Sequence, residues 1–176
     1  MFITKNHKIN LYILVKSIDG GTGTFLLNLL DIKKRYNQKY LDFKVLILEK
    51  PTYRSLIIEN ARYLNENDSY PTKYHISLKN FLDFLREIRW IHKNINKLQN
   101  TVIISIDFRS NLLAIIVKML WLRSAKVIAT IHIDQGQTIV DKSSIFAGVI
   151  LNFITKLFYE RADILICGSK GIAHKL

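Results

Sequence analysis

The stretch LYILVKSIDGGTGTFLLNLLDIKKRY, residues 11–36, carries the pattern that decides the fold. It opens on a continuous apolar run, residues 11–15, which is typical of a strand covered on both faces in a parallel sheet. Glycines follow. From residue 24 to residue 36 the apolar side chains then recur on one stripe with lysines opposite, which predicts a helix. A buried strand, a glycine turn and an amphipathic helix are the opening parts of a β-α-β unit.

The same alternation continues to the end of the chain. Further strands are predicted at residues 43–48, 101–106, 126–131 and 163–167, and further helices at residues 77–98, 110–123, 143–161 and from Ser169 onward. Strands that alternate with helices predict a parallel sheet, right-handed crossovers and helices on both faces. We therefore expect an α/β fold: a Rossmann-like three-layer α/β/α domain with a mainly parallel sheet.

Residues 52–74 do not follow this alternation clearly. Leu56, Ile57, Ala61 and Leu64 indicate a short helix. Residues 65–68 and Pro71 indicate a turn, and residues 74–76 a brief strand.

The composition favours one domain. The chain has 176 residues, 49% of them hydrophobic, and no Gly/Ser-rich or Pro-rich linker divides it. We expect residues 1–176 to form a single domain. The one cysteine, Cys167, excludes an intramolecular disulfide and a CxxC zinc site, which fits a reducing, cytoplasmic compartment. It follows an apolar run and is expected to pack as a small hydrophobic side chain.

The formal charge of +12 favours anionic partners, which include nucleic acid, acidic lipid and phosphorylated substrates. The basic residues are spread along the chain, so solvated helix faces account for most of them. No nucleic-acid-reading module is recognisable, and we expect no nucleic-acid partner. No signal peptide is evident. Two very apolar stretches, residues 112–122 and 145–158, carry Lys118 and Lys156 and predict buried helices rather than membrane spans.

Ligands of parallel α/β sheets bind outside the carboxyl ends of the strands, so the residues after each strand are candidates for function. Gly20, Gly21, Thr22 and Gly23 follow the first strand, and the N–H groups of the next helix suit a phosphate or a sugar hydroxyl. A tight turn with no ligand explains the same residues. The stretch is neither a GxGxxG fingerprint nor a P-loop, because the third glycine and the GK[ST] end are missing.

Three other strand ends carry polar residues. His132 can act there as an acid, a base or a hydrogen-bond donor, or it can be structural. Ser169 is a helix N-cap that, with Lys170, also suits a phosphate. Asp107 and Arg109 either line the cleft or form a surface ion pair. No residue spacing predicts a metal site.

Three segments together resemble the N-terminal domain of family 4 glycosyltransferases, which have the GT-B fold. GGTGTFLLNLL, residues 20–30, is similar to the family's double-glycine turn and helix. IATIH, residues 128–132, is similar to its strand that ends in a histidine. RADILICGSKGI, residues 161–172, is similar to its alanine–aspartate pair, apolar strand, serine and helix. Gly23 departs from the acidic residue that many members carry.

The resemblance implies that this chain is one half of a GT-B enzyme that transfers a sugar with retention. This half would hold a glycan or lipid-linked acceptor. A C-terminal domain absent from this chain would bind the nucleotide-sugar and supply a paired-glutamate motif, with no metal and no further cofactor. His132 would be the catalytic residue near the transferred sugar, Gly20 and Gly21 would face the donor phosphates or the acceptor, and Ser169 would lie near the cleft.

The resemblance also implies a cytoplasmic location at the inner face of a membrane, and the +12 charge is consistent with contact to anionic lipid. Two other functions stay open. The chain can be a non-catalytic Rossmann-like module that binds a phosphorylated ligand or a protein partner. Nucleic-acid binding is supported by the charge alone.

Overall fold

Six strands form one sheet in the computed structural model, which describes residues 8–18, 21–35, 41–49, 61–65, 78–95, 100–131, 153 and 155–173. The strands are β1 (Ile9–Val15), β2 (Leu41–Glu49), β3 (Ala61–Asn65), β4 (Thr101–Ile106), β5 (Lys126–Ile131) and β6 (Ile164–Cys167). The helices are α1 (Gly21–Arg35), α2 (Leu78–Asn94), α3 (Phe108–Leu120) and α6 (Lys170–Ala173), and residues 155–159 are also helical.

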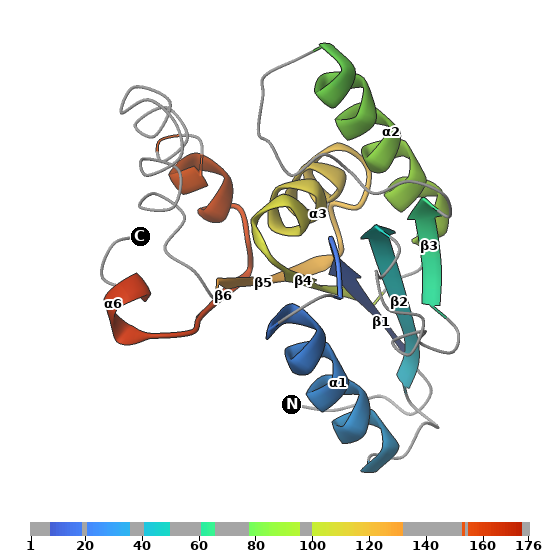
Figure 1. The fold of residues 1–176 in the computed structure, drawn as a ribbon, viewed down its shortest axis with the longest axis vertical. Coiled ribbons are helices and arrows are strands. Elements are labelled where there is room, and N and C mark those ends of the chain that lie inside the picture. Colours follow the sequence, from blue (N-terminus) through green and yellow to red (C-terminus); the bar gives the residue numbers. More distant parts are fainter. Residues whose placement is uncertain are drawn as a thin grey trace.

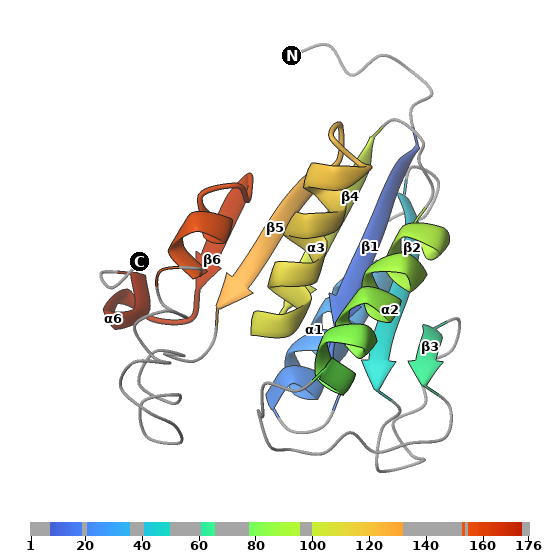
Figure 2. The same cartoon turned by 90° about the horizontal axis from the view of Figure 1, so that it is seen from above.

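The strand order is β3-β2-β1-β4-β5-β6, and every neighbouring pair is parallel. From β1 to β3 each strand is added on one side of β1. The chain then returns to the other side of β1, where β4, β5 and β6 are added in order. Figure 1 shows α2 and α3 on one face of the sheet and α1 on the other, and Figure 2 shows the same layers from above. The expected Rossmann-like α/β fold is therefore confirmed.

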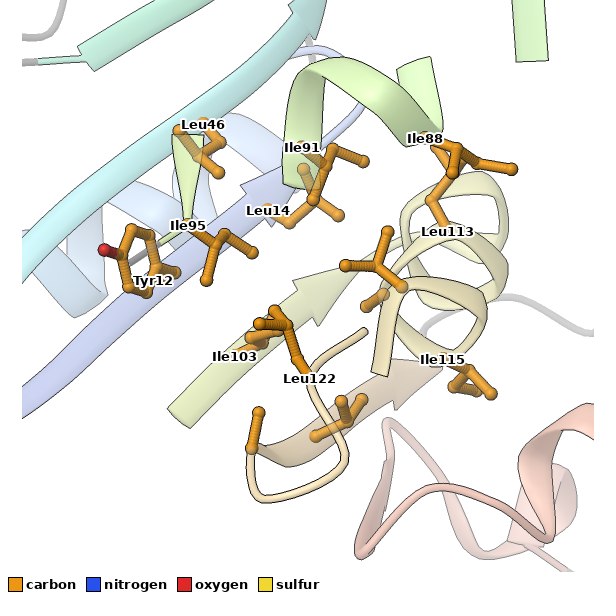
Figure 3. Close-up of a cluster of buried hydrophobic side chains, with 14 of the residues drawn as sticks. Tyr12, Leu14, Leu46, Ile88, Ile91, Ile95, Ile103, Leu113, Ile115 and Leu122 are labelled. Carbon is orange, nitrogen blue, oxygen red and sulfur yellow. The ribbon is translucent and has the colours of Figure 1, made fainter. Parts of the chain in front are cut away.

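Each face of the sheet has its own hydrophobic core, because successive side chains of a strand point to opposite faces. In β1, Tyr12 and Leu14 pack into the larger cluster under α2 and α3, whereas Ile13 and Val15 pack into the smaller cluster under α1. Figure 3 shows the larger cluster, in which Leu14 and other strand side chains meet Leu113 of α3. Burial of such an aliphatic side chain contributes about 1.5–3 kcal/mol, so these clusters hold the helices onto the sheet.

The ambiguous stretch contains a strand where we expected a short helix. Ala61 and Leu64 belong to β3, whose Ala61 and Tyr63 lie opposite Val45 and Ile47 of β2. Ala61 and Tyr63 pack on the α1 side and Leu64 packs on the other side, which is the two-residue period of a strand. The brief strand predicted at residues 74–76 lies outside the described residues.

Some helix boundaries also differ from the sequence-based expectation. Residues 77–98 were predicted to be helical, but α2 ends at Asn94. The Asn94 side chain donates to the carbonyl oxygen of Trp90 at 2.8 Å and accepts from Arg62 Nη1 at 2.6 Å. The backbone ladder still reaches Ile95, whose N–H donates to the carbonyl oxygen of Ile91 at 2.9 Å, and the Asn94 side chain joins the end of α2 to Arg62 of β3. Of the helix predicted at residues 143–161, only residues 153 and 155–161 are described.

The outer strand β6 has little cover. Its three apolar residues Ile164, Leu165 and Ile166 are 52%, 38% and 47% exposed, although they point to alternate faces. Cys167, at its end, packs against the larger core as predicted. Among the helices that the structure describes, none is both long enough and apolar enough to cross a bilayer.

Candidate ligand site at the carboxyl edge of the sheet

The point where the strand order reverses lies between β1 and β4, which are hydrogen-bonded neighbours. After β1 the chain enters α1 on one face, and after β4 it enters α3 on the other face (Figure 2). In open α/β sheets ligands bind at such a switch point, outside the carboxyl ends of the strands. The fold thus places the residues that follow β1 and β4 at the expected position for a ligand.

Gly21 and Gly23 lie in the first turn of α1 rather than in a turn in front of it. The helix begins at Gly21, three residues earlier than the predicted start at Thr24, and Gly20 lies outside the described residues. A Cβ on Gly23 would lie 1.9 Å from the carbonyl oxygen of Ile18, so only glycine fits where α1 packs on the preceding backbone. Helix propensity alone places the start after the glycines, because glycine is a poor helix former.

Gly21 and Thr22 differ from Gly23 in their surroundings. Gly21 is exposed, and no atom of the described residues lies within 4 Å of the position that a Cβ would occupy. Thr22 is partly exposed, and Gly23 is buried. The first N–H groups of a helix have no partner within the helix and carry the positive end of its dipole. The open side of the turn at Gly21 therefore suits an anion or a hydroxyl group, whereas Gly23 is explained by packing alone.

Asp107 occupies the other side of the switch point. It is the N-cap of α3, so the helix starts at Phe108 and not at the predicted Ser110. Its carboxylate accepts hydrogen bonds from the backbone N–H of Ser110 at 3.0 Å, from Ser110 Oγ at 2.9 Å and from the backbone N–H of Lys16 at 2.8 Å. Burial raises the pKa of the Asp107 carboxyl, while the hydrogen bonds from Ser110 and Lys16 work in the opposite direction. Its φ of 85° is strained for a residue with a Cβ.

Two ion pairs surround this position. Lys16 Nζ lies 3.5 Å from a Glu49 carboxylate oxygen and joins the ends of β1 and β2. Arg109 donates from Nε and Nη2 to the two carboxylate oxygens of Glu87 in α2, at 2.8 and 3.0 Å. The Glu87 side chain is only 2% exposed, and burial raises its pKa while Arg109 lowers it. Arg109 thus pairs across the helix layer with a buried glutamate, not with Asp107 in a surface ion pair.

Ser169 and Lys170 lie at the end of β6. The carbonyl oxygen of Ser169 accepts from the N–H of Ala173 at 3.2 Å, which places Ser169 at the N-cap of the short helix α6. Both residues are exposed. The strand order separates the ends of β1 and β6 by three strand spacings, or about 14 Å. A single phosphate therefore cannot contact both Gly21 and Ser169, but an extended ligand can.

His132 lies outside the described residues, although the two residues before it are well fixed. The carbonyl oxygen of Ile131 accepts from the N–H of Gly168 at 2.8 Å, which joins the ends of β5 and β6. The carbonyl oxygen of Thr130 accepts from Asn111 Nδ2 at 2.9 Å. Two predicted segments, the end of β5 and the turn after β6, are thus directly bonded.

A buried polar network lies beside the ends of β4 and β5, and no sequence pattern predicted it. It joins α3, β4, β5 and the helical residues 155–159, and its members are Ser105, Asn111, Thr130 and Tyr159. Burial raises the pKa of Tyr159 to about 12, so its hydroxyl group keeps its proton at neutral pH. The only signal in the sequence is a polar residue inside an otherwise apolar run, as at Asn111 in NLLAIIV. In the described parts of the chain no three His, Cys, Asp or Glu side chains are grouped so as to hold a metal ion.

Comparison with known proteins supports the fold. No family model matches the chain, and no curated protein matches it in sequence. Among solved structures, the N-terminal domain of trehalose-6-phosphate phosphatase from Candida albicans is similar, with a TM-score of 0.55 and 12% sequence identity. The match covers 94% of this chain and 41% of that one, so the chain spans less than half the length of its structural neighbour. At this identity the likeness extends to the Rossmann-like α/β architecture.

Proposed function

We propose that this domain is the acceptor-side half of a retaining glycosyltransferase of the GT-B type. The observation that carries the proposal is the placement of the three segments that resemble family 4 glycosyltransferases. The segment 20–30 follows β1, the segment 128–132 includes the end of β5, and the segment 161–172 includes β6. These three are parallel strands of one sheet and end at one edge. A nucleotide-sugar with its acceptor is long enough to reach from the end of β1 to the end of β6.

In this proposal the chain's own residues bind and orient the substrates. The N–H groups at Gly21 and Thr22 bind a phosphate or a sugar hydroxyl group. Ser169 and Lys170 contact the far end of the substrate, and His132 serves the transferred sugar as the catalytic residue. The nucleotide-sugar is bound mainly by a second domain outside these residues, and the reaction uses no metal.

The test is sugar transfer by the complete polypeptide. It is incubated with a panel of labelled nucleotide-sugars and with glycan and lipid-linked acceptors. We expect transfer by the unmodified protein and a severe loss in His132→Ala. His92→Ala is the matched control, because α2 carries His92 near its C-terminal end, away from the carboxyl edge. Absence of transfer across the panel, or normal turnover in His132→Ala, contradicts the proposal.

One observation favours a second candidate, a non-catalytic module for a phosphorylated ligand. The open first turn at Gly21 suits a phosphate whether or not another domain contributes. Calorimetric titration of the 176-residue chain with inorganic phosphate and with a nucleoside diphosphate tests it. Binding that Gly21→Ala weakens, in a polypeptide without transfer activity, favours the module over the enzyme.

The proposal includes peripheral contact with an anionic membrane at the cytoplasmic face. The exposed side of α2 supports it. Phe81 and Leu82 are 57% and 56% exposed, and Arg86, Arg89 and Lys93 continue this exposed side along the helix. Exposed apolar residues next to basic ones are typical of helices that lie in a lipid interface.

A further inference from the structure

Arg109 is held in one orientation by a carboxylate that solvent hardly reaches. Its Nε and Nη2 atoms donate to the two carboxylate oxygens of Glu87 at 2.8 and 3.0 Å. The Glu87 side chain is 2% exposed, whereas that of Arg109 is 24% exposed. A guanidinium group carries its N–H donors in a rigid planar fork, so two bonds to one carboxylate fix its plane. The accessible part of Arg109 is therefore presented to solvent in a defined direction.

Stability alone does not account for this ion pair. Taking two charges out of water costs free energy, and apolar side chains of similar volume often stabilise a fold as well or better. The pair is also asymmetric, because the carboxylate is buried and the arginine is accessible. Arg109 follows β4 at the point where the strand order reverses, which is where open α/β sheets bind ligands. An arginine that is oriented at this position suits contact with a ligand.

The charges around Arg109 indicate the class of that ligand. Glu49, the last residue of β2, lies 3.5 Å from Lys16 Nζ. Burial raises the pKa of the Glu87 carboxyl, Arg109 lowers it, and the nearby charges of Glu49 and Asp83 raise it. Among the described residues at this position carboxylates therefore outnumber cations, although the chain as a whole carries a charge of +12. Carboxylates repel an anion, whereas hydroxyl groups can donate to carboxylates and accept from arginine and lysine.

We propose that Arg109 binds hydroxyl groups of a neutral sugar and that Glu87 is the positioning residue that orients it. This inference rests on the proposed function, because it assigns the sugar part of the acceptor to the ends of β1 and β4. The open first turn of α1 at Gly21 stays the proposed position for a phosphate. The two positions are neighbours, since β1 and β4 are adjacent strands of the sheet.

Binding is measured by magnetic resonance on the complete polypeptide with isotope-labelled arginine, through the Nε–H signal of Arg109. The signal is assigned by its loss in Arg109→Lys. The probes are the methyl glycosides of glucose, galactose, mannose and N-acetylglucosamine, and inorganic phosphate. We expect a glycoside to shift the Arg109 signal and phosphate to leave it in place. Arg62 is the internal control, because it also contacts α2, through Asn94 at the other end of that helix, and its signal should not move.

Three variants separate sugar binding from stability. Arg109→Lys keeps the charge and loses the planar fork, and Glu87→Gln keeps the size and loses the charge that orients Arg109. Each should raise the KM for the acceptor about tenfold to a hundredfold, the range expected for loss of a hydrogen bond to a charged group. The kcat should change less, because the lost contact serves binding.

The third variant combines Glu87→Met with Arg109→Met, so that no buried charge is left without its partner. It should melt close to the unmodified protein and still bind the acceptor more weakly. Arg62→Lys is the matched control and should keep the KM of the unmodified protein.

Three results overturn the inference: a shift of the Arg109 signal by phosphate and by no glycoside, no shift with any probe, or a normal KM in the folded double variant. Absence of sugar transfer by the unmodified protein is a different failure, because it removes the proposed function. The glycoside titration still decides in that case whether Arg109 binds a sugar.

Discussion

The backbone N–H of Lys16 donates to the carboxylate of Asp107 at 2.8 Å, which joins two residues 91 positions apart at the point where the strand order reverses. The same carboxylate caps α3 through Ser110. One side chain thus holds the end of β1, the end of β4 and the start of a helix. The cap is kept although the backbone of Asp107 has a φ of 85°, which is strained for any residue with a Cβ.

Asp107→Ala should destabilise the domain more than Asp107→Gly. Both variants lose the helix cap and the bond to Lys16, which together stabilise the fold by about 1–3 kcal/mol. Glycine adopts the positive φ without strain, whereas alanine keeps the strain and offers no cap. Urea denaturation followed by circular dichroism measures the two free energies of unfolding. If the alanine variant is as stable as the glycine variant, backbone strain at Asp107 does not affect the free energy of unfolding.

Gly21→Ala and Gly23→Ala should differ sharply, although both lie in the first turn of α1. In the part of the chain that the structure describes, nothing lies within 4 Å of the Cβ position of Gly21, so alanine is expected to keep or slightly raise the melting temperature. A Cβ on Gly23 would lie 1.9 Å from the carbonyl oxygen of Ile18, so α1 must shift, at a cost of about 1–3 kcal/mol or more. Thermal unfolding of the two variants side by side checks this. Equal melting temperatures would mean that α1 does not pack on Ile18 as described.

The stability of the domain should depend on Asp163 at acid pH. Partial burial disfavours its charge, but hydrogen bonds from Lys118, Val127 and Lys126 outweigh burial and lower the pKa of Asp163 to about 2. A carboxyl group with a pKa lowered by folding stabilises the folded state above its unfolded pKa of about 3.9. That contribution is lost as the pH falls from about 4 to about 2.

Asp163→Asn provides the comparison for this pH dependence. The variant lacks the titrating group, so its free energy of unfolding should change less between pH 4 and pH 2 than that of the unmodified domain. Chemical denaturation at a series of pH values measures both slopes. Identical slopes would assign the acid sensitivity to other carboxyl groups.

Membrane contact should require the exposed side of α2. We expect the domain to float with vesicles that contain anionic lipid and to stay in solution with neutral vesicles. Arg86→Glu combined with Arg89→Glu should abolish flotation, since each basic residue near an anionic surface contributes about 1 kcal/mol. Arg123→Glu combined with Lys156→Glu is the matched control, because these exposed basic residues lie outside α2. Equal binding to neutral vesicles, or flotation of the α2 variant, would argue against this surface.

The parts of the fold that depend on local patterns could be predicted from the sequence. The strands at residues 101–106 and 126–131 have their predicted bounds, because each is a short apolar run between polar residues. β3 could not be predicted, since the apolar residues Ala61, Tyr63 and Leu64 in a segment of only five residues fit either a helix or a strand period, and the pairing with β2 decides. The predicted start of α3 at Ser110 was wrong, because only the fold brings the carboxylate of Asp107, the N-cap of α3, to the backbone N–H of Lys16.

The positions of the candidate residues at the strand ends could be predicted, their contacts could not, and their role in a site stays a prediction. The rule that ligands bind at the carboxyl ends of parallel strands led to Gly21, Ser169 and Lys170 without any structure. The network around Asn111 could not be found in this way. Its partners Thr130 and Tyr159 lie 19 and 48 positions away along the chain, and no local pattern connects them.

The thinly covered strand β6 has a consequence for the handling of the protein. Its backbone pairs with β5, and its three apolar side chains are 38–52% exposed without a charge or a proline among them. Edge strands of natural proteins usually carry charged residues or proline, because an edge strand without them can form backbone hydrogen bonds with a strand of another molecule. At the concentrations used for crystallisation or magnetic resonance, the 176-residue chain is therefore expected to self-associate through β6. Replacing Leu165 by lysine should keep it monomeric in analytical ultracentrifugation.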